Sequence, residues 1–411
     1  MSGGSIGARS GPAAGDVSSR PISASERIDG IDVLRGLALF GVLAMNIATV
    51  FRVSIFAQFL PNPERAGPLD RAVSALLTVA VDFKALALFS LLFGIGLAIQ
   101  FERLAGNARR MILLVRRLAA LLVIGLVHLY LIWNGDILVE YALAGLVVLP
   151  FLGGSRWLVA GAAVLLLGLY AAMPLLPPIV QLPGTAGMAA LVADATRAYG
   201  TGGFFDVLAF RVREVAAIVP LHVMVFPRTV GLFLLGIFVW RSGMLRRPSA
   251  NRRLLLAAAA VGILLGGGFC LAASGRELFD WPSLGRWHFP TERLGAIVLA
   301  LGYAAAVIAA VSLPGGRKML AWAAPLGRMA FTNYLAQSVI LGWIFYGYGL
   351  GQFGRLGVAA TLAIGVLLYV GQAMFSAWWL RRYRFGPVEW LWRSCMYGAL
   401  QPMRSTSKPR S

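Results

Sequence analysis

Charged residues are scarce in this chain of 411 residues: Asp, Glu, Lys and Arg make up only 13% of it, whereas 59% is hydrophobic. Soluble proteins carry about a quarter charged residues. The composition therefore excludes a disordered protein and argues against a soluble enzyme. Cysteine is nearly absent as well. The two that occur, Cys270 and Cys395, form no metal-binding or redox spacing and predict no disulfide.

Patterns typical of a metal site or of a phosphate-binding loop are also missing. The three histidines, His128, His222 and His288, lie too far apart to follow a metal-ligand spacing, and no Walker-type loop occurs. We therefore predict no metal site and no bound cofactor.

Residues 1–26 are rich in Ser, Gly, Ala and Pro without an apolar run, so they predict a disordered N-terminal arm and no cleavable signal.

Acidic residues are few, since 17 Asp and Glu stand against 37 Lys and Arg, for a net charge of +20. No basic stretch is interleaved with aromatic residues, so this charge does not predict a nucleic-acid partner. Ten apolar segments alternate with the basic clusters, and all but the short fourth approach the ~20 residues that cross a bilayer. The segments are Val33–Phe51, Phe83–Phe101, Ile112–Trp133, Ile137–Phe151, Trp157–Leu176, Ile218–Trp240, Leu254–Ala273, Leu294–Leu313, Met329–Tyr348 and Val358–Leu380.

The positions of the positive charges orient these segments. With the N-terminus in the cytoplasm, about two thirds of the Lys and Arg residues fall in cytoplasmic loops, as the positive-inside rule requires. We therefore predict an all-α, polytopic integral membrane protein with about ten transmembrane helices and both termini cytoplasmic. Its expected partners are the lipid bilayer, anionic lipids at the cytoplasmic face, and an unknown small-molecule, glycan or lipid substrate.

The predicted organisation has five parts. After the arm 1–26 come a first membrane half with five helices (27–178), an external loop (179–217), a second membrane half (218–397) and a basic cytoplasmic tail (398–411). A second long external loop spans 274–292. Long loops in compact proteins are often binding surfaces.

His128 is the most informative ionisable residue, because polar groups inside a membrane segment are costly unless paired or functional. The turn Asn134-Gly135-Asp136 folds the fourth segment back on the third. Asp136, and also Glu140, are then expected near His128. A histidine beside a carboxylate is the minimal general-base pair. The alternative is a packing histidine beside an ordinary turn residue.

Three arginines are candidates for binding the phosphates of an anionic cytosolic ligand. Arg35 shares a helix face with Asp32 at the cytoplasmic start of the first segment, and Arg116 and Arg117 begin the third. The alternative for Asp32 and Arg35 is helix capping and anchoring at the interface.

Lys84 enters the second segment near the outer face, where it is a candidate catalytic residue. The alternative is a lysine whose side chain reaches to the interface.

Further polar residues are candidates for binding a substrate. Asn46 lies deep in the first segment and Tyr141 in the fourth, while Asn333 and Gln337 share one face of the ninth. With Asp32 they complete the predicted substrate-binding set. The alternative for the amides is a hydrogen bond between helices.

Four groups of residues together resemble a known family. They are Asp32-Val-Leu-Arg35-Gly36 with Asn46; Lys84 with Leu92-Phe93-Gly94-Ile95-Gly96; His128 with Trp133-Asn-Gly-Asp136-Ile-Leu and Tyr141; and Gly327-Arg328 with Thr332-Asn333-Tyr334, Gln337 and Gly386-Pro387-Val-Glu389-Trp-Leu-Trp-Arg393. The set resembles the YeiB-like family of bacterial inner-membrane proteins, whose C-terminal half is a domain of unknown function, over nearly the whole chain. The resemblance implies a multi-pass protein of the bacterial inner (plasma) membrane.

The layout is also similar to that of multi-helix membrane acyltransferases of the heparan-glucosaminide acetyltransferase type, which share the Asp-x-x-Arg-Gly opening. These enzymes move an acyl group from cytosolic acyl-CoA to an acceptor across the membrane. Their key histidine lies in the loop after the first helix, whereas that loop here, 52–71, contains none. His128 would have to serve in its place.

An intramembrane histidine beside an outer carboxylate, with arginines at the inner rim, favours acyl transfer from cytosolic acyl-CoA, a co-substrate, to an extracytoplasmic acceptor. His128 would be the base and Asp136 its orienting group. The alternative is a small-molecule transporter or exporter, in which Lys84, His128, Asp136 and Glu140 form a proton relay. A structural or sensory membrane protein is the third class. The absence of a convincing internal repeat between the two membrane halves disfavours a transporter.

Overall fold

The computed structural model describes residues 29–60, 67–279 and 282–404. The predicted arm 1–26 and the last seven residues of the predicted tail lie outside the described residues. Within them the regular secondary structure is helical, and the β-structure is limited to one isolated bridge between Tyr383 and Arg404. The α-helices are α1 (Asp29–Asn46), α2 (Pro68–Ala80), α3 (Lys84–Arg103), α4 (Arg110–Val127), α5 (Leu138–Val148), α6 (Arg156–Ala172), α7 (Thr185–Thr201), α8 (Phe204–Arg241), α9 (Arg252–Phe279), α10 (His288–Val311), α11 (Pro314–Leu320), α12 (Ala323–Arg328), α13 (Ala330–Phe345), α14 (Val358–Trp379) and α15 (Pro387–Tyr397).

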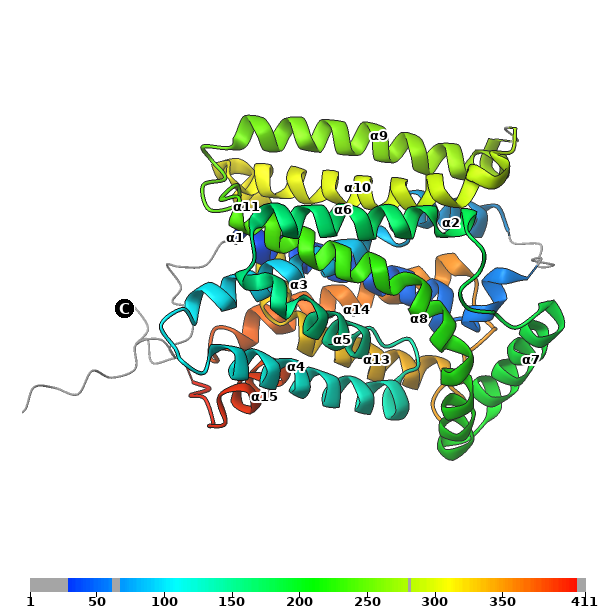
Figure 1. Ribbon diagram of the computed structural model, residues 1–411. Coiled ribbons are helices and arrows are strands. Elements are labelled where there is room, and N and C mark those ends of the chain that lie inside the picture. The colour runs from blue at the N-terminus through cyan, green and yellow to red at the C-terminus, as the bar shows by residue number, and fades with distance from the viewer. Residues whose placement is uncertain (1–28, 61–66, 280–281, 405–411) are drawn as a thin grey trace, which may run out of the picture.

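The helices of the two predicted membrane halves pack into one bundle (Figure 1). α1 packs against α12 and α3 against α8, so that helices from 27–178 and 218–397 are interleaved, while α9 and α10 form a pair. The start of α1, the turn between α3 and α4, and α15 lie at the same end of the bundle (Figure 1). This end carries the basic clusters from which a cytoplasmic orientation is predicted.

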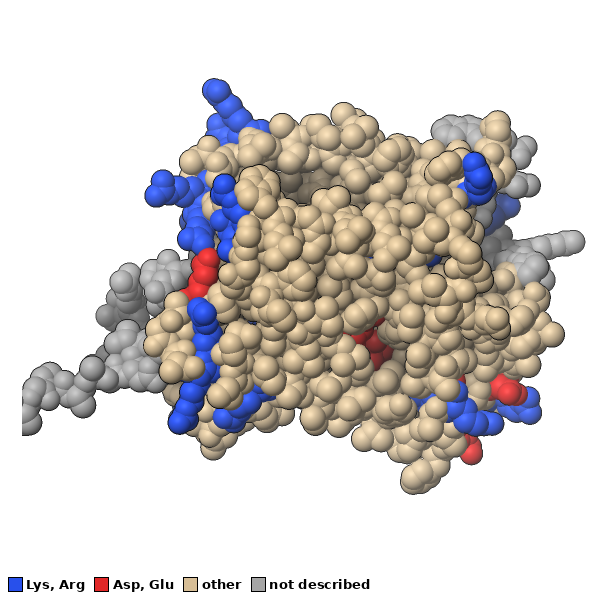
Figure 2. Space-filling model, viewed as in Figure 1, with Lys and Arg blue, Asp and Glu red and all other residues tan. Residues whose placement is uncertain are grey.

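Eight helical stretches in the described part of the chain are long and apolar enough to cross a membrane. They correspond to eight of the ten predicted segments. The other two predicted segments form the shorter helices α5 and α13, and the total of ten stays a prediction. Charged side chains gather at the two ends of the molecule and leave a broad band between them with few charges (Figure 2). The predicted fold class, an all-α polytopic membrane protein, is confirmed.

The segment 179–217, predicted as an external loop, contains α7 and the first turns of α8. α8 begins at Phe204 because the backbone N–H of Gly203 donates to the carboxylate of Asp206 (3.0 Å), which caps the helix. Neither Pro220 nor Pro227 ends it, and α8 reaches 38 residues. Together with α7, the start of α8 projects beyond the opposite end of the bundle (Figure 1).

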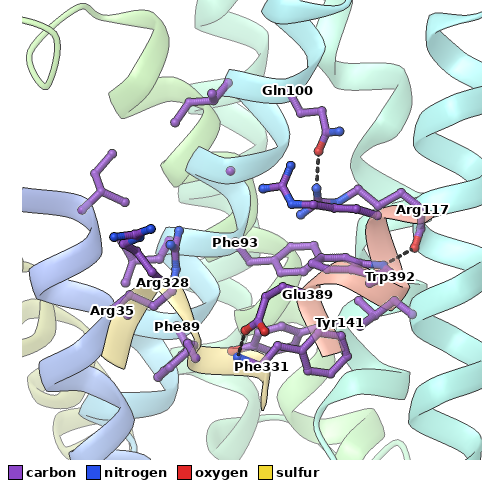
Figure 3. Close-up of a pocket in the computed structure, with 18 of the residues that line it drawn as sticks. Arg35, Phe89, Phe93, Gln100, Arg117, Tyr141, Arg328, Phe331, Glu389 and Trp392 are labelled. Atoms are coloured by element: carbon purple, nitrogen blue, oxygen red, sulfur yellow. Dashed lines mark hydrogen bonds between the residues drawn. The ribbon is translucent and has the colours of Figure 1, made fainter. Parts of the chain in front are cut away.

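Two glycines set the close approach of α1 and α12. A Cβ on Gly36 would overlap the carbonyl oxygen of Ala323, and a Cβ on Gly327 would overlap that of Asp32. Small residues allow helix backbones to approach in this way. Because Arg35 precedes Gly36 and Arg328 follows Gly327, the contact brings these two arginines together, as Figure 3 shows.

Candidate functional site

A cavity of about 450 Å³ lies among α1, α3, α4, α5, α8, α12, α13 and α15. Its lining begins at the end of the bundle that holds the start of α1 and the end of α3, and it continues inward to the start of α5. Sites for small ligands have volumes of about 300–1,000 Å³. The cavity, part of which is drawn in Figure 3, is therefore large enough for a small-molecule ligand.

Arginine dominates the polar lining. Among the described residues that line the cavity, six arginines stand against two carboxylates: Arg35, Arg103, Arg117, Arg328, Arg384 and Arg393, against Asp32 and Glu389. Arg35 donates to Asp32 at 3.0 Å. Guanidinium groups bind phosphates and carboxylates through parallel hydrogen bonds. The excess of positive charge suits a ligand with several negative charges.

Arg117 and Trp392 form one wall of the cavity (Figure 3). The guanidinium carbon of Arg117 lies 3.9 Å from the centroid of the Trp392 ring, a cation–π contact. Arg117 also donates to the side chain of Gln100, and Trp392 Nε1 donates to the carbonyl oxygen of Arg117 at 2.7 Å. These contacts join α4 to α15 and fix the guanidinium in the wall.

Glu389 holds α15 against the start of α13. Its carboxylate accepts the backbone N–H groups of Phe331 (2.8 Å) and Thr332 (3.1 Å) and the Thr332 hydroxyl (2.5 Å). The first N–H groups of a helix have no partner within it, so Glu389 acts as a cap supplied by another helix. Burial raises the pKa of Glu389, and the hydrogen bonds from Thr332 oppose this rise. Because both of its oxygens accept hydrogen bonds from α13, the carboxylate of Glu389 is engaged within the protein.

The inner part of the cavity is apolar and aromatic, and Leu138, Tyr141 and Tyr334 line it. The hydroxyl of Tyr141 lies within hydrogen-bond distance of Ser90 Oγ (2.9 Å) and of the carbonyl oxygen of Leu86 (3.2 Å). A ligand that fits this cavity has an anionic end among the arginines and an uncharged part near the tyrosines.

His128 and Asp136 form a buried pair next to the inner end of the cavity. His128 Nδ1 lies 2.7 Å from Asp136 Oδ1, and both side chains are fully inaccessible to solvent. The other carboxylate oxygen accepts the N–H of Val139 at 2.8 Å, which fixes Asp136 at the start of α5. Tyr334 lines the cavity and also contacts the pair, since its ring centroid is 5.2 Å from that of His128.

The pair has the geometry of a general base with its orienting carboxylate. When the Nδ1–H group donates to Asp136, the lone pair of the imidazole is on Nε2, and Nε2 has no hydrogen-bond partner among the described residues. α4 continues directly into a single π-helical turn, His128–Ile132, and the helical stretch ends there. Gly125 lets α5 approach, because a Cβ there would lie 2.8 Å from the nitrogen of Val139.

Glu140 lies elsewhere than the sequence suggests. Its carboxylate accepts the hydroxyl of Thr229 and lies 2.8 Å from His222 Nδ1. Both partners are on α8, against which α5 packs. Glu140 therefore faces α8. Of the two carboxylates expected near His128, only Asp136 is paired with it.

Of the residues predicted for the site, Asp32, Arg35, Arg117 and Tyr141 line the cavity, whereas Lys84, Arg116, Asn46, Asn333 and Gln337 do not. The amides of Asn333 and Gln337 donate to side chains of α14, at 2.9 and 2.8 Å, and so hold two helices together. Lys84 donates to the carbonyl oxygen of Thr78 (2.6 Å), and Arg116 donates to that of Cys395 (3.0 Å). Asn46 is buried in α1.

Among the lining residues that sequence reasoning did not assign to the site are Arg328, Glu389 and Trp392. Each belongs to the motifs that carry the family resemblance, so a signal was present in the sequence. Their convergence depends on the packing of α12 on α1 and of α15 on α4, which residue spacing does not reveal.

Similarity to other proteins extends over the whole bundle that builds this cavity. Residues 239–399 match a family model described as a protein of unknown function (DUF418). The chain is 33% identical over 411 aligned residues to the uncharacterized protein YxaH of Bacillus subtilis, with 95% of this chain and 99% of that protein covered. It is 31% identical over 402 aligned residues to the uncharacterized protein YeiB of Escherichia coli, with 92% and 98% covered. The chain is thus a multi-pass membrane protein that belongs to the YeiB-like family.

Proposed function

We propose that this protein transfers an acyl group from a cytosolic acyl-CoA to an acceptor on the opposite side of the membrane. One observation carries the proposal. The buried pair of His128 and Asp136 adjoins, through Tyr334, the inner end of a cavity whose other end is lined by arginine. A general base and an anion-binding site thus meet inside the bundle.

The shape of the cavity supports a CoA thioester as the donor. CoA carries phosphate groups at one end and the thioester at the end of a narrow, uncharged arm. Arg35, Arg117 and Arg328 would bind the phosphates, and the arm would extend toward Tyr141 and Tyr334. Arg117 and His128 are eleven residues apart along one helical stretch, or about 16 Å at 1.5 Å per residue, which separates phosphate and reaction sites along the membrane normal.

The proposed reaction needs one base. His128 Nε2 accepts the proton of an acceptor hydroxyl while the acceptor oxygen bonds to the carbonyl carbon of the thioester. The carbon–sulfur bond breaks, and the proton passes to the sulfur, so that an ester and free CoA are formed. Asp136 holds the imidazole in the required tautomer and stabilises its positive charge.

Release of CoA tests the proposal. Purified protein in nanodiscs is mixed with acetyl-CoA and an extract of bacterial envelope glycans and lipids, and free CoA is quantified by mass spectrometry, because the exposed Cys395 would react with thiol reagents. We expect CoA release that depends on both protein and extract. Protein that neither binds acetyl-CoA nor releases CoA would refute the proposal.

Arg35→Gln is expected to raise the KM for acetyl-CoA at least about tenfold with little change in kcat. The substitution removes a charged hydrogen-bond donor, worth about 1.5–3 kcal/mol, from the binding of the donor and not from the chemical step. Arg197→Gln is the matched control, because Arg197 pairs with Asp194 on the exposed surface of α7, away from the cavity. Equal KM values for the two variants would contradict the role of Arg35.

Proton-coupled transport is the second candidate function, and the pairing of Glu140 with His222 and Thr229 inside the membrane band favours it. Such pairs mark proton pathways in membrane proteins. Lys84 and the His128–Asp136 pair make separate hydrogen bonds, so a relay would start from Glu140 and His222. Uptake of envelope metabolites into vesicles that depends on a pH gradient, occurs without acyl-CoA and is lost in His222→Ala would favour transport over acyl transfer.

A further inference from the structure

A second group of buried polar residues lies beyond the His128–Asp136 pair. We define the outer polar cluster as Trp133, Asn134, Tyr199, Arg211 and Glu214, all at most 2% exposed. The turn after His128–Ile132, α7 and the first part of α8 contribute these residues, none of which lines the arginine-lined cavity. Trp133 connects the cluster to the pair, since its ring centroid is 6.1 Å from that of His128.

Glu214 is the centre of the outer polar cluster. Its carboxylate accepts the hydroxyl of Tyr199 (2.5 Å) and the amide N–H of Asn134 (2.6 Å). Arg211, one turn earlier on α8, donates to the carbonyl oxygen of Tyr130 (3.3 Å). Removing two opposite charges from solvent is costly even when they compensate each other, so the cluster is not explained by stability alone.

Three buried atoms of this cluster and one of His128 have no hydrogen-bond partner within the described ranges of the chain. Two are donors, Trp133 Nε1 and Arg211 Nε, and two are acceptors, Asn134 Oδ1 and His128 Nε2. Buried polar atoms without partners are rare in folded proteins. Four of them in one chain of contacts, around a candidate general base, indicate a site built to bind a polar group.

We infer that the outer polar cluster binds the acceptor, and that the acceptor is a neutral, hydroxyl-rich molecule, namely a sugar ring. The charges of Arg211 and Glu214 balance, so the site selects no net charge. It offers both donors and acceptors, and a hydroxyl is the group that both donates and accepts. A hydroxyl bound beside Trp133 would lie next to His128. The inference rests on the proposed acyl transfer, because it names the molecule that receives the acyl group.

The position of the cluster agrees with this assignment. It lies toward the end of the bundle where α7 projects, opposite the end that holds the arginine-lined cavity (Figure 1). α7 covers the cluster with Tyr199 and packs on α8. A sugar would therefore reach His128 from the predicted outer side, while acyl-CoA would reach it from the predicted cytoplasmic side.

Enantiomers of simple hexoses provide the test. Thermal unfolding of the protein in nanodiscs is measured in D- and L-glucose, D- and L-galactose, and D- and L-mannose. Two enantiomers are identical as osmolytes, so only specific binding separates them. We expect at least one pair to differ by about 2 °C or more in unfolding midpoint at saturating concentration.

Trp133→Phe assigns this binding to the cluster. Trp133 stacks on Phe51, at 4.4 Å between centroids and 11° between planes. Phenylalanine keeps an aromatic ring at this place but is smaller than the indole, and it removes the unpartnered N–H. We expect the half-saturating sugar concentration to rise about fivefold, the effect of one lost hydrogen bond. Trp157→Phe, at a side chain of α6 that is 67% exposed, is the matched control and should bind as the wild type does.

Each outcome decides the inference. Absence of a difference within all three enantiomer pairs overturns it, as does a difference that Trp133→Phe leaves unchanged. If Trp133→Phe does not fold, Arg211→Lys replaces it, because lysine keeps the charge near Glu214 and removes the Nε donor. CoA release without sugar discrimination overturns the inference alone. Sugar discrimination without CoA release overturns the proposed acyl transfer, and with it the role of the sugar as acceptor, but keeps the sugar site itself.

Discussion

Replacement of His128 by alanine is expected to lower the rate of CoA release by about 10²–10⁴-fold, which is the usual contribution of a positioned general base. The KM for acetyl-CoA should change little, because His128 is not among the residues that line the cavity. The measurement is steady-state release of CoA from acetyl-CoA by protein in nanodiscs. Protein that is folded and releases CoA at the wild-type rate would remove His128 from the mechanism.

Two further variants separate catalysis from packing. Asp136→Asn keeps the volume of the side chain but no longer holds the imidazole in the required tautomer, so we expect a large loss in kcat here too. His288→Ala removes a histidine at the start of α10, outside the cavity and the outer polar cluster, and should retain the wild-type rate. A uniform loss of rate in all three variants would indicate a general loss of folded protein.

The helices were predictable because a membrane span is a local property of the sequence. About 20 apolar residues between charged ends suffice to define one, and the predicted segment Val358–Leu380 differs from α14 by one residue. α8 shows the limit of this signal. Arg211 and Glu214 lower the hydropathy before Ile218 although the helix continues through them. Hydropathy thus marks where a helix is apolar and not where it begins.

The candidate site was predictable only in part, because its geometry depends on contacts between residues far apart in the sequence. Asn333 and Gln337 share a helix face as predicted, but that face is turned toward α14. A hydrogen bond between helices satisfies a buried amide as well as a substrate does. Conversely, Arg328 joins Arg35 in the cavity because α12 packs on α1, and no local pattern encodes that pairing.

Gly327→Ala tests this pairing and is expected to cause the largest loss of stability. The added Cβ would overlap the carbonyl oxygen of Asp32 and lie 2.9 Å from the nitrogen of Gly36. Both are backbone atoms, so no side-chain rotation relieves the overlap, and α12 must move away from α1. Overpacking costs about 1–3 kcal/mol and more where the backbone shifts. We expect a lower unfolding midpoint and a lower yield of folded protein in detergent.

Gly371→Ala is the matched control for this substitution. Gly371 lies in the exposed surface of α14, where an added Cβ meets no atom within 4 Å, and alanine favours a helix over glycine by about 0.5–1 kcal/mol. Its unfolding midpoint should equal or exceed that of the wild type. The folded fraction of Gly327→Ala should also show a raised KM for acetyl-CoA, because Arg35 and Arg328 separate when α12 moves. Equal midpoints for the two variants would show that the close approach of α1 and α12 does not contribute to stability, and an unchanged KM would show that it does not hold the arginines in place.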